Sequence, residues 1–182
     1  MPSEILTTLR LLLRPPMESD VESITGMLGE WEVARNLSSP PHPYGPEHAR
    51  AHLANSQQGR ADCSGYNFAI CRRQDETHVG MIGIRTRGDR ALEMGYWIGK
   101  PYWGAGYATE AGRRMADFAF AELGLSHLMA GWFVDNPASG KVLAKLGFID
   151  HGEDERFSLA RGETVPSHRM ILDRTRWEKA SS

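Results

Sequence analysis

The chain has 182 residues, of which 41% are apolar and 24% are charged, a composition typical of one folded domain over residues 1–182. Its formal net charge of −2 shows no basic excess that would favour a nucleic-acid partner, and no apolar run is long enough to cross a membrane. Two cysteines, Cys63 and Cys71, have neither the spacing of metal ligands nor the number that a disulfide framework needs. These features argue against nucleic-acid-binding and membrane-spanning proteins, and they favour a cytoplasmic protein.

The first half of the chain is predicted to form one strand, two helices and then a meander of three strands. A pair of prolines ends the first strand, and Ser19 followed by Glu22 has the spacing of a helix-capping box. Residues 36–46 carry four prolines and must form a loop, with Pro46 opening the next helix. Strands are expected over residues 9–14, 66–72, 77–85 and 92–98, helices over residues 19–28 and 46–59, and a turn at Gly88 and Asp89.

The second half begins with a glycine-rich turn and is predicted to alternate helices with strands. Ala108, Ala111 and Met115 form an apolar stripe at helical spacing, and Gly147 has the position of a helix C-terminal cap. Helices are expected over residues 108–123 and 137–146, and strands over residues 127–134, from residue 148 onward and over residues 167–173. This order predicts a mixed α/β domain with an antiparallel meander first and an αβ crossover second.

The glycine-rich turn is the strongest chemical signal in the sequence. Small residues allow the backbone to approach an anion, and the first N–H groups of a helix have no partner inside the helix. Together with the helix dipole they bind phosphate, so a strand-to-helix turn of this composition predicts a ligand that carries a diphosphate. The turn consists of Trp103, Gly104, Ala105, Gly106, Tyr107, Ala108 and Thr109.

Three interpretations are open on the turn alone. A dinucleotide cofactor is the first, because Gly104 and Gly106 begin a G-x-G-x-x-G fingerprint and Asp135 follows the next strand. Against it, Thr109 stands where the third glycine belongs, and too little chain remains for a full doubly wound sheet. The second interpretation is an ordinary helix-opening turn without a ligand, and the third is a site for coenzyme A.

Four short segments carry a further signal: EMGYWIG (residues 93–99), YWGAGYATEA (102–111), DNPAS (135–139) and KLGF (145–148). As a set they resemble the GNAT superfamily of N-acetyltransferases, and are most similar to the branch of the RimJ/RimL ribosomal-protein N-terminal acetyltransferases. The resemblance covers nearly the whole chain. It implies a mixed α/β fold with a mostly antiparallel sheet of about six to seven strands, splayed at the coenzyme site, with helices on both faces. It also implies direct transfer of the acetyl group of acetyl-CoA to a primary amine in a ternary complex.

The resemblance assigns the coenzyme site residue by residue. The superfamily's phosphate pattern is Gln or Arg, two residues, Gly, one residue, then Gly or Ala. It falls on Trp103, Gly106 and Ala108, and Trp103 departs from it at the first place. The pantetheine arm would pair like an added strand with the strand before the turn, nearest Trp97 and Ile98. Cofactor contacts are therefore expected from Trp97, Ile98, Trp103, Gly104, Ala105, Gly106, Tyr107, Ala108, Thr109, Asn136 and Ser139.

Glu93 is the candidate base that takes a proton from the attacking amine. It lies in an otherwise apolar strand, and Gly95 on the same face leaves room for a substrate. The alternative is a structural ion pair between Glu93 and an arginine such as Arg85 or Arg90. The residue types alone do not choose between these two roles.

Asn136 and Ser139 come directly after the strand expected over residues 127–134, which follows the helix that the glycine-rich turn opens. By resemblance, Asn136 contacts the coenzyme's arm, and Ser139 lies near the sulfur as the proton donor to the leaving thiolate. A second interpretation of Asn136 is as the N-cap of the helix that begins at Pro137, and both roles are compatible.

Other features of the sequence leave the partner open. His48 and His52 have a metal-ligand spacing on a predicted helix but lack a third ligand, so a solvated helix face and no metal site are expected. Residues 36–46, the first two predicted helices and residues 157–168 are expected to set the acceptor, which is either a protein N-terminus or a small-molecule amine. A monomer and a homodimer both fit the sequence. A functional alternative is a non-catalytic acyl-CoA-binding module that senses the ligand or recruits a partner.

Overall fold

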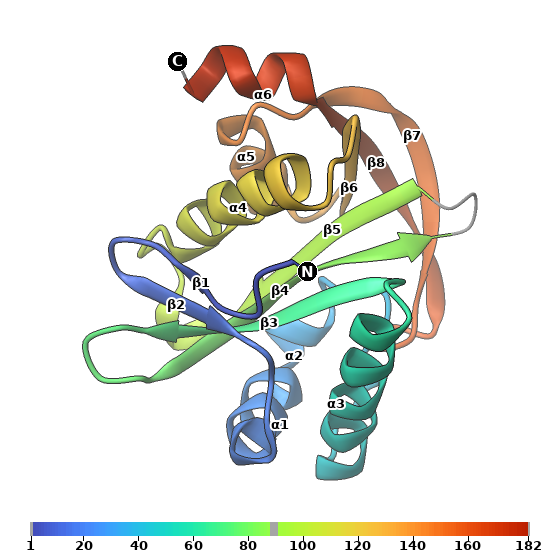
Figure 1. Ribbon diagram of the computed structural model, residues 1–182. Helices are drawn as coiled ribbons and strands as arrows, with labels where there is room; N and C mark the ends of the chain where they lie inside the picture. The colour runs from blue at the N-terminus through green and yellow to red at the C-terminus, as the bar shows by residue number, and fades with distance from the viewer. Residues whose placement is uncertain (1, 88–90, 182) are drawn as a thin grey trace.

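The computed structural model describes residues 2–87 and 91–181, so the turn expected at Gly88 and Asp89 lies outside the described residues. Its strands form one sheet in the order β1-β2-β3-β4-β5-β6-β8-β7 (Figure 1). In chain order the strands are β1 (Leu6–Thr7), β2 (Leu11–Arg14), β3 (Gly65–Arg72), β4 (His78–Arg87), β5 (Ala91–Ile98), β6 (His127–Phe133), β7 (Ile149–Ser158) and β8 (Glu163–Asp173).

Every neighbouring pair in this sheet is antiparallel except β5 and β6, which run parallel. The mostly antiparallel sheet that the resemblance implies is therefore confirmed. The sheet has eight strands because the expected first strand is a tight hairpin, in which Leu6 pairs with Leu13 and Thr8 N–H donates to the Leu11 carbonyl at 2.9 Å. The two-residue β1 has no hydrophobic alternation of its own, so the sequence pattern does not reveal it.

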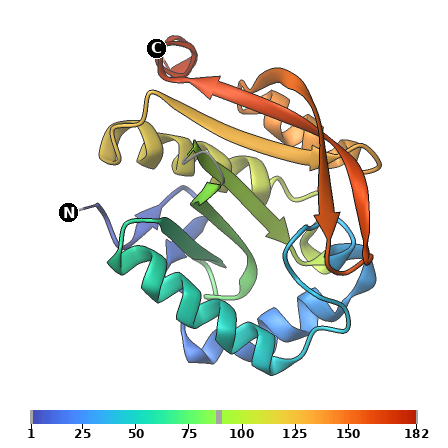
Figure 2. The same ribbon diagram turned by 90° about the vertical axis from the view of Figure 1, so that its right-hand side faces the viewer.

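Helices lie on both faces of the sheet, as expected (Figures 1 and 2). The helices are α1 (Val21–Gly29), α2 (Trp31–Ala34), α3 (Pro46–Ala61), α4 (Tyr107–Asp117), α5 (Pro137–Lys145) and α6 (Arg174–Ser181). Shorter helical turns cover Glu18–Asp20, Lys100–Tyr102 and, with π-helical geometry, Phe118–Glu122. Figure 1 shows α1, α2 and α3 below the sheet and α4, α5 and α6 above it. No helix among the described residues is long and apolar enough to span a bilayer.

The first helix begins differently from the prediction. The predicted cap, Ser19, lies within the short helical turn, and α1 itself begins at Val21. The entry is fixed instead by Asp20, whose carboxylate accepts the Met17 N–H at 2.9 Å and pairs with Arg14 at 2.7 and 2.8 Å. The capping contact is therefore local but displaced, with the buried Asp20 and the Met17 N–H in place of Ser19 and Glu22.

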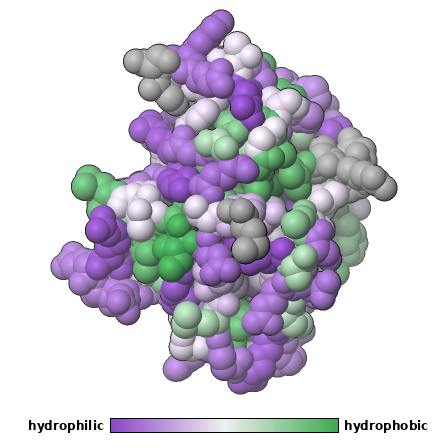
Figure 3. Space-filling model, in the orientation of Figure 1, coloured by the Kyte–Doolittle hydropathy of each residue, from purple (hydrophilic) through white to green (hydrophobic). Residues whose placement is uncertain are grey.

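Two apolar clusters pack against the opposite faces of the sheet. The larger lies under α4 and includes Phe68, Phe118 and Met94, and the smaller lies under α1 and α3 and includes Ile24 and Leu53. Because side chains alternate along a strand, β5 contributes to both clusters. The face seen in Figure 3 is mostly hydrophilic, with its described apolar residues in separate small patches.

The sheet is splayed between its two central strands. The common register of β5 and β6 consists of two described pairs, Glu93 with Met129 and Met94 with Ala130. Beyond Met94, β5 continues to Ile98 in register with β4 only, so its other edge is without a ladder partner among the described residues. This splay is the feature that positions the candidate site.

Candidate active site

The turn between β5 and α4 has the geometry of an anion-binding site. Gly104 and Gly106 have φ values of 77° and 81°, in the left-handed region that glycine adopts without strain. Gly106 is the N-cap of α4, and it has no side chain to satisfy the helix's first N–H groups. Residues 103–106 are exposed, and the indole of Trp103 anchors the turn by donating to the Ile98 carbonyl at 2.7 Å. Exposed helix N–H groups in such a turn are free to bind phosphate.

A groove of about 610 Å³ runs along the length of α4 and reaches the glycine-rich turn at Gly106. Its charged lining is mainly basic, with four arginine or lysine side chains against two acidic ones. The lining residues are Thr7, Thr8, Arg10, Gly106, Thr109, Glu110, Arg113, Arg114, Asp117 and Lys145. A basic groove next to exposed N–H groups fits the phosphates of coenzyme A.

Ser139 is paired with a tyrosine that sequence reasoning missed. The Tyr96 hydroxyl lies 2.8 Å from Ser139 Oγ and 3.2 Å from the Ser139 carbonyl oxygen. Burial raises the pKa of Tyr96 to about 12, against a smaller opposite effect of the bond with Ser139. The phenol therefore keeps its proton at neutral pH. The signal in the sequence is weak, because Tyr96 stands out only once β5 is known to face the start of α5.

Asn136 caps the helix that carries Ser139. Its side chain accepts the Ser139 N–H at 3.4 Å, and the Asn136 N–H donates to the Phe133 carbonyl at 2.7 Å. The capping role is therefore confirmed, and it fixes where Ser139 lies relative to β6. Contact between Asn136 and the coenzyme's arm stays a prediction.

Glu93 forms a close ion pair with Arg156 of β7. Arg156 Nη1 lies 2.6 Å from Glu93 Oε1 and Nη2 lies 3.1 Å from Oε2, and the two side chains are only 8% and 14% exposed. A Cβ added at Gly131 of β6 would collide with the Arg156 guanidinium. The missing side chain at this glycine therefore leaves room for Arg156 to reach Glu93 on β5. Of the two arginines expected as partners, Arg85 donates to Ser39 Oγ at 3.0 Å, and Arg90 lies outside the described residues.

Glu93 and Tyr96 point to opposite faces of β5, because they are three residues apart on a strand. Glu93 shares its face with Gly95, where an added Cβ would meet nothing within 4 Å. The space that the sequence predicts beside Glu93 is therefore present. The splay of β5 from β6 begins directly beyond Met94, between the levels of Glu93 and Tyr96.

Two of the regions expected to set the acceptor, residues 36–46 and 157–168, lie against each other. Arg161, in the turn between β7 and β8, pairs with both oxygens of Asp135 at 2.8 and 3.0 Å and donates to the Arg35 carbonyl at 2.7 Å. Arg35 Nη2 also donates to Asp135 at 3.0 Å, and the Arg161 bonds, followed by those of Arg35, lower the pKa of Asp135.

Two further bonds join the hairpin to the loop after α2: Ser158 Oγ to the Leu37 carbonyl at 3.0 Å and the Leu159 N–H to the Ser38 carbonyl at 3.1 Å. Figure 2 shows the hairpin reaching this loop.

The two histidines at metal-ligand spacing have separate structural roles. His48 Nδ1 accepts the Gly45 N–H at 2.9 Å and so helps to cap α3. His52 is half-buried, not on a solvated face as expected, because α3 packs against the sheet; burial of its ring lowers its pKa. Among the described residues, no group of three His, Cys, Asp or Glu side chains is placed to hold a metal ion.

Residues 10–149 match the model of a family described as the acetyltransferase (GNAT) domain. The chain belongs to the GNAT acetyltransferase family. It is 30% identical over 165 residues to YoaA, an uncharacterized N-acetyltransferase of Bacillus subtilis, covering 87% of this chain and 90% of that protein. It is 26% identical over 172 residues to the [ribosomal protein uS5]-alanine N-acetyltransferase of Escherichia coli, covering 89% and 87% of the two chains.

The fold agrees with solved acetyltransferases. The structure of RimL, a ribosomal L7/L12 α-N-protein acetyltransferase in complex with coenzyme A, superposes with a TM-score of 0.81 at 18% identity. The match covers 93% of this chain and 98% of that one. The family match confirms the resemblance to GNAT acetyltransferases and the use of acetyl-CoA, and the similar proteins include members of the RimJ/RimL branch. The exposed turn and its basic groove fit that co-substrate.

Proposed function

We propose that this acetyltransferase moves the acetyl group of acetyl-CoA directly to the N-terminal amine of a peptide or protein, within a ternary complex. The observation that carries this proposal is the splay of β5 from β6, with an exposed anion-binding turn after β5 and the Tyr96–Ser139 hydroxyl pair beside it. The names of the E. coli relative and of RimL, which describe acetylation of a ribosomal-protein alanine and of a protein α-nitrogen, support the choice of acceptor.

The co-substrate is held mainly by backbone groups in this proposal. The N–H groups of the turn over residues 103–109 receive the pyrophosphate, supported by the left-handed Gly104 and Gly106. The edge of β5 at Trp97 and Ile98 receives the pantetheine arm, supported by the absence of a described ladder partner there, while the Ile98 carbonyl itself accepts the Trp103 indole N–H. Asn136 contacts the arm while capping α5.

Ser139 and Tyr96 handle the proton that the leaving thiolate needs. The products are an amide and a free thiol, so the thiolate gains one proton and the amine loses one. Ser139 Oγ donates its proton to the thiolate as the Tyr96 phenol, 2.8 Å away, passes its own proton to Ser139, and Tyr96 regains a proton from solvent once the thiol has left.

Glu93 receives the amine's proton through a water molecule in this proposal. Each of its carboxylate oxygens accepts one N–H from Arg156, and Gly95 on the same face of β5 leaves open space beside the pair for a water. Arg156 fixes the direction of the carboxylate. An N-terminal α-amine, with an ordinary pKa of about 8, is partly neutral at physiological pH and needs less help than a lysine.

A screen of acetyl-CoA turnover against amines tests the proposal. Free thiol is measured with peptides that begin with Ala or Ser, with the same peptides blocked at the N-terminus but carrying a lysine, and with polyamines. We expect turnover on the free N-termini and none on the blocked peptides. Binding of acetyl-CoA by calorimetry without turnover on any amine would instead support the sensor module, which the comparisons with named acetyltransferases do not favour.

Glu93→Gln tests the base. Because Gln keeps a hydrogen bond to Arg156 but cannot hold the proton, we expect kcat to fall by about 100-fold or more. Glu155→Gln, which removes an exposed carboxylate from the same strand as Arg156, is the matched control. Unchanged turnover in Glu93→Gln removes Glu93 from the mechanism.

A further inference from the structure

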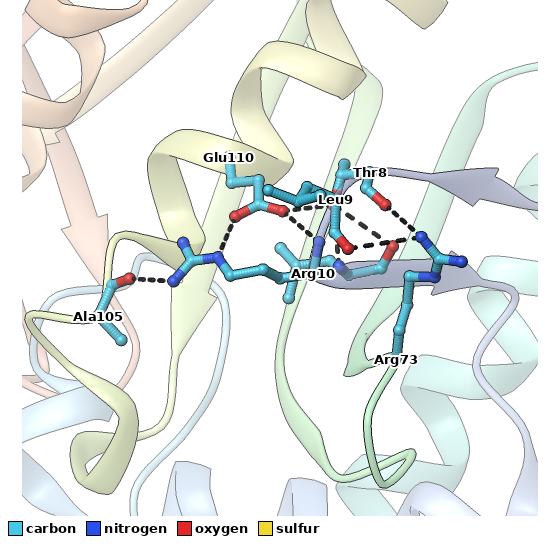
Figure 4. Close-up of polar contacts among 7 residues, drawn as sticks. Thr8, Leu9, Arg10, Arg73, Ala105 and Glu110 are labelled. Carbon is cyan, nitrogen blue, oxygen red and sulfur yellow. Dashed lines mark hydrogen bonds and ion pairs between the residues drawn. The ribbon is translucent and has the colours of Figure 1, made fainter.

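The anion-binding turn is held in place by the first hairpin of the chain. Residues 103–106 are exposed and include two left-handed glycines, so the turn alone would be conformationally free and would lose that freedom on binding. Arg10, in the corner between β1 and β2, reaches this turn, and Arg10 Nη1 donates to the Ala105 carbonyl at 3.0 Å (Figure 4). A segment about 95 residues away in sequence thus fixes one peptide of the turn.

Arg10 is itself fixed by Glu110 of α4. Its Nε lies 2.7 Å from Glu110 Oε2, and its backbone N–H donates to Oε1 at 2.9 Å. Thr8 Oγ1 donates to the same Oε1 at 2.6 Å, and the Arg10 guanidinium carbon lies 4.9 Å from the centre of the Tyr107 ring. Burial alone would raise the pKa of Glu110, but the bonds from Thr8 and Arg10 outweigh it and lower the pKa. The carboxylate therefore stays charged and holds the guanidinium fork in one orientation.

The bond to Ala105 also sets the direction of the next N–H. A trans peptide is planar, so its C=O and N–H groups point in opposite directions. With the Ala105 carbonyl turned toward Arg10, the Gly106 N–H must point to the other side of the turn. Gly106 is the N-cap of α4, so this N–H stands with the helix's first exposed donors.

We propose that Arg10, held by Glu110, is a positioning residue for the coenzyme's pyrophosphate, because it fixes the Ala105–Gly106 peptide with its N–H facing the phosphate. The inference rests on the proposed coenzyme site at residues 103–109. It assigns to the first hairpin of the chain a role in the affinity for acetyl-CoA and none in the chemical step.

Arg10→Gln tests the brace, with Arg73→Gln as its matched control. Arg73 donates to the Thr8 and Leu9 carbonyls of the same corner at 3.0 and 3.4 Å, so the control removes an equal charge from the same corner (Figure 4). We expect Arg10→Gln to raise the Kd and KM for acetyl-CoA about ten-fold, the effect of one lost charge-assisted hydrogen bond, with kcat and the acceptor KM unchanged. Arg73→Gln should stay within about two-fold of the wild type.

Arg10→Lys and ionic strength separate positioning from simple attraction. Lysine keeps the charge but cannot donate to Ala105 and Glu110 in one planar fork, so we expect it to restore only part of the affinity. The loss of acetyl-CoA affinity in Arg10→Gln should persist at high salt. Adding Glu110→Gln to Arg10→Gln should lower the affinity little further. Full rescue by lysine, or a loss that vanishes at high salt, would overturn the positioning role.

The wild type separates this inference from the proposed site. If wild-type protein binds acetyl-CoA and a folded Arg10→Gln binds it equally well, the brace is wrong and the site stands. If the wild type itself does not bind acetyl-CoA, the site and the brace are both overturned. Thermal melting of each variant shows that it is folded, and Arg10→Lys supplies the comparison if Arg10→Gln is not.

Discussion

Tyr96 and Ser139 form a proton-holding pair within the candidate site. Each hydroxyl is the other's partner at 2.8 Å, and burial keeps the phenol protonated by raising its pKa to about 12. A serine alone has an exchangeable proton but no nearby source from which to regain it. In the proposed mechanism, Ser139 is the proton donor to the thiolate and Tyr96 supplies the next proton to Ser139.

Replacing Tyr96 tests this pair. Tyr96→Phe keeps the ring's packing but leaves Ser139 Oγ without the phenol, so we expect kcat to fall about ten-fold with the KM for acetyl-CoA unchanged. Steady-state kinetics on a free-N-terminal peptide make the measurement. Tyr66→Phe, which removes a buried hydroxyl on β3, is the control and should keep full activity. A Tyr96→Phe enzyme that keeps its kcat while Ser139→Ala loses it would reduce Tyr96 to a packing role.

Single residues were predictable where their partners are close in sequence. Asn136 and Ser139 are three apart and belong to one helix start, so their proximity follows from the sequence. The partners of Glu93 and Ser139 were not predictable, because they depend on how strands far apart in the chain are ordered. Arg156 is 63 residues from Glu93 and reaches it only because Gly131 leaves room.

Among the elements, the β7–β8 hairpin is one of those expected to contact the acceptor. Its turn is tied to α2 and the following loop through Asp135, which accepts from Arg161 and Arg35. Asp135 directly precedes Asn136, so the same short segment connects the hairpin to the coenzyme side of the site. Loosening the hairpin should therefore change the acceptor's fit and leave coenzyme binding alone.

Asp135→Asn tests this separation. The Asp135 side chain is 38% exposed and its ion pairs are each worth little, so we expect a rise of about two- to five-fold in the acceptor KM. The KM for acetyl-CoA should stay constant. Asp75→Asn, which breaks the ion pair with Arg72 in the turn after β3, is the control. A rise confined to the acetyl-CoA KM would show that Asp135 acts through Asn136 and not through the hairpin.

Elements with local punctuation were predicted closely, and those held by tertiary contacts were not. Helix α3 begins at Pro46 and α5 at Pro137, as the prolines indicate. Helix α6 was missed, since its polar sequence has no apolar stripe. It is held in place by Arg174, which donates to the Phe120 and Leu125 carbonyls at 2.6 and 3.0 Å.

For the molecule as a whole, a buried histidine, His78, and a half-buried one, His52, predict how stability changes with pH. Burial lowers the pKa values of His52 and His78 below their unfolded value, with Arg85 adding to the effect at His52. As the pH falls through about 6.5, the unfolded chain takes up protons that the folded chain refuses, so stability decreases toward lower pH. Asp20 acts in a separate, more acidic window, because its pKa is lowered and its contribution is lost only near and below its ordinary value of 3.8.

We therefore expect the melting temperature to drop by a few degrees between about pH 7.5 and about pH 5.5. The melting temperature of His52→Gln should drop less over this range, because glutamine does not titrate. The substitution should be tolerated, since the buried Nε2 of His52 has no hydrogen-bond partner to lose. Differential scanning calorimetry at constant ionic strength makes the comparison. An equal slope in wild type and variant would show that His52 does not contribute.

The short register between β5 and β6 is also a mechanical seam. On one side, β1 to β5 form a continuous antiparallel ladder, and on the other, β6, β8 and β7 form a second one. Side-chain bonds cross the seam, among them Glu93 to Arg156, Tyr96 to Ser139 and Arg35 to Asp135. Separation of the two ladders would have to break these bonds. A ligand that contacts both β5 and β6 would hold the two ladders together. The contacts that give the ligand its affinity would then also protect the protein against local opening.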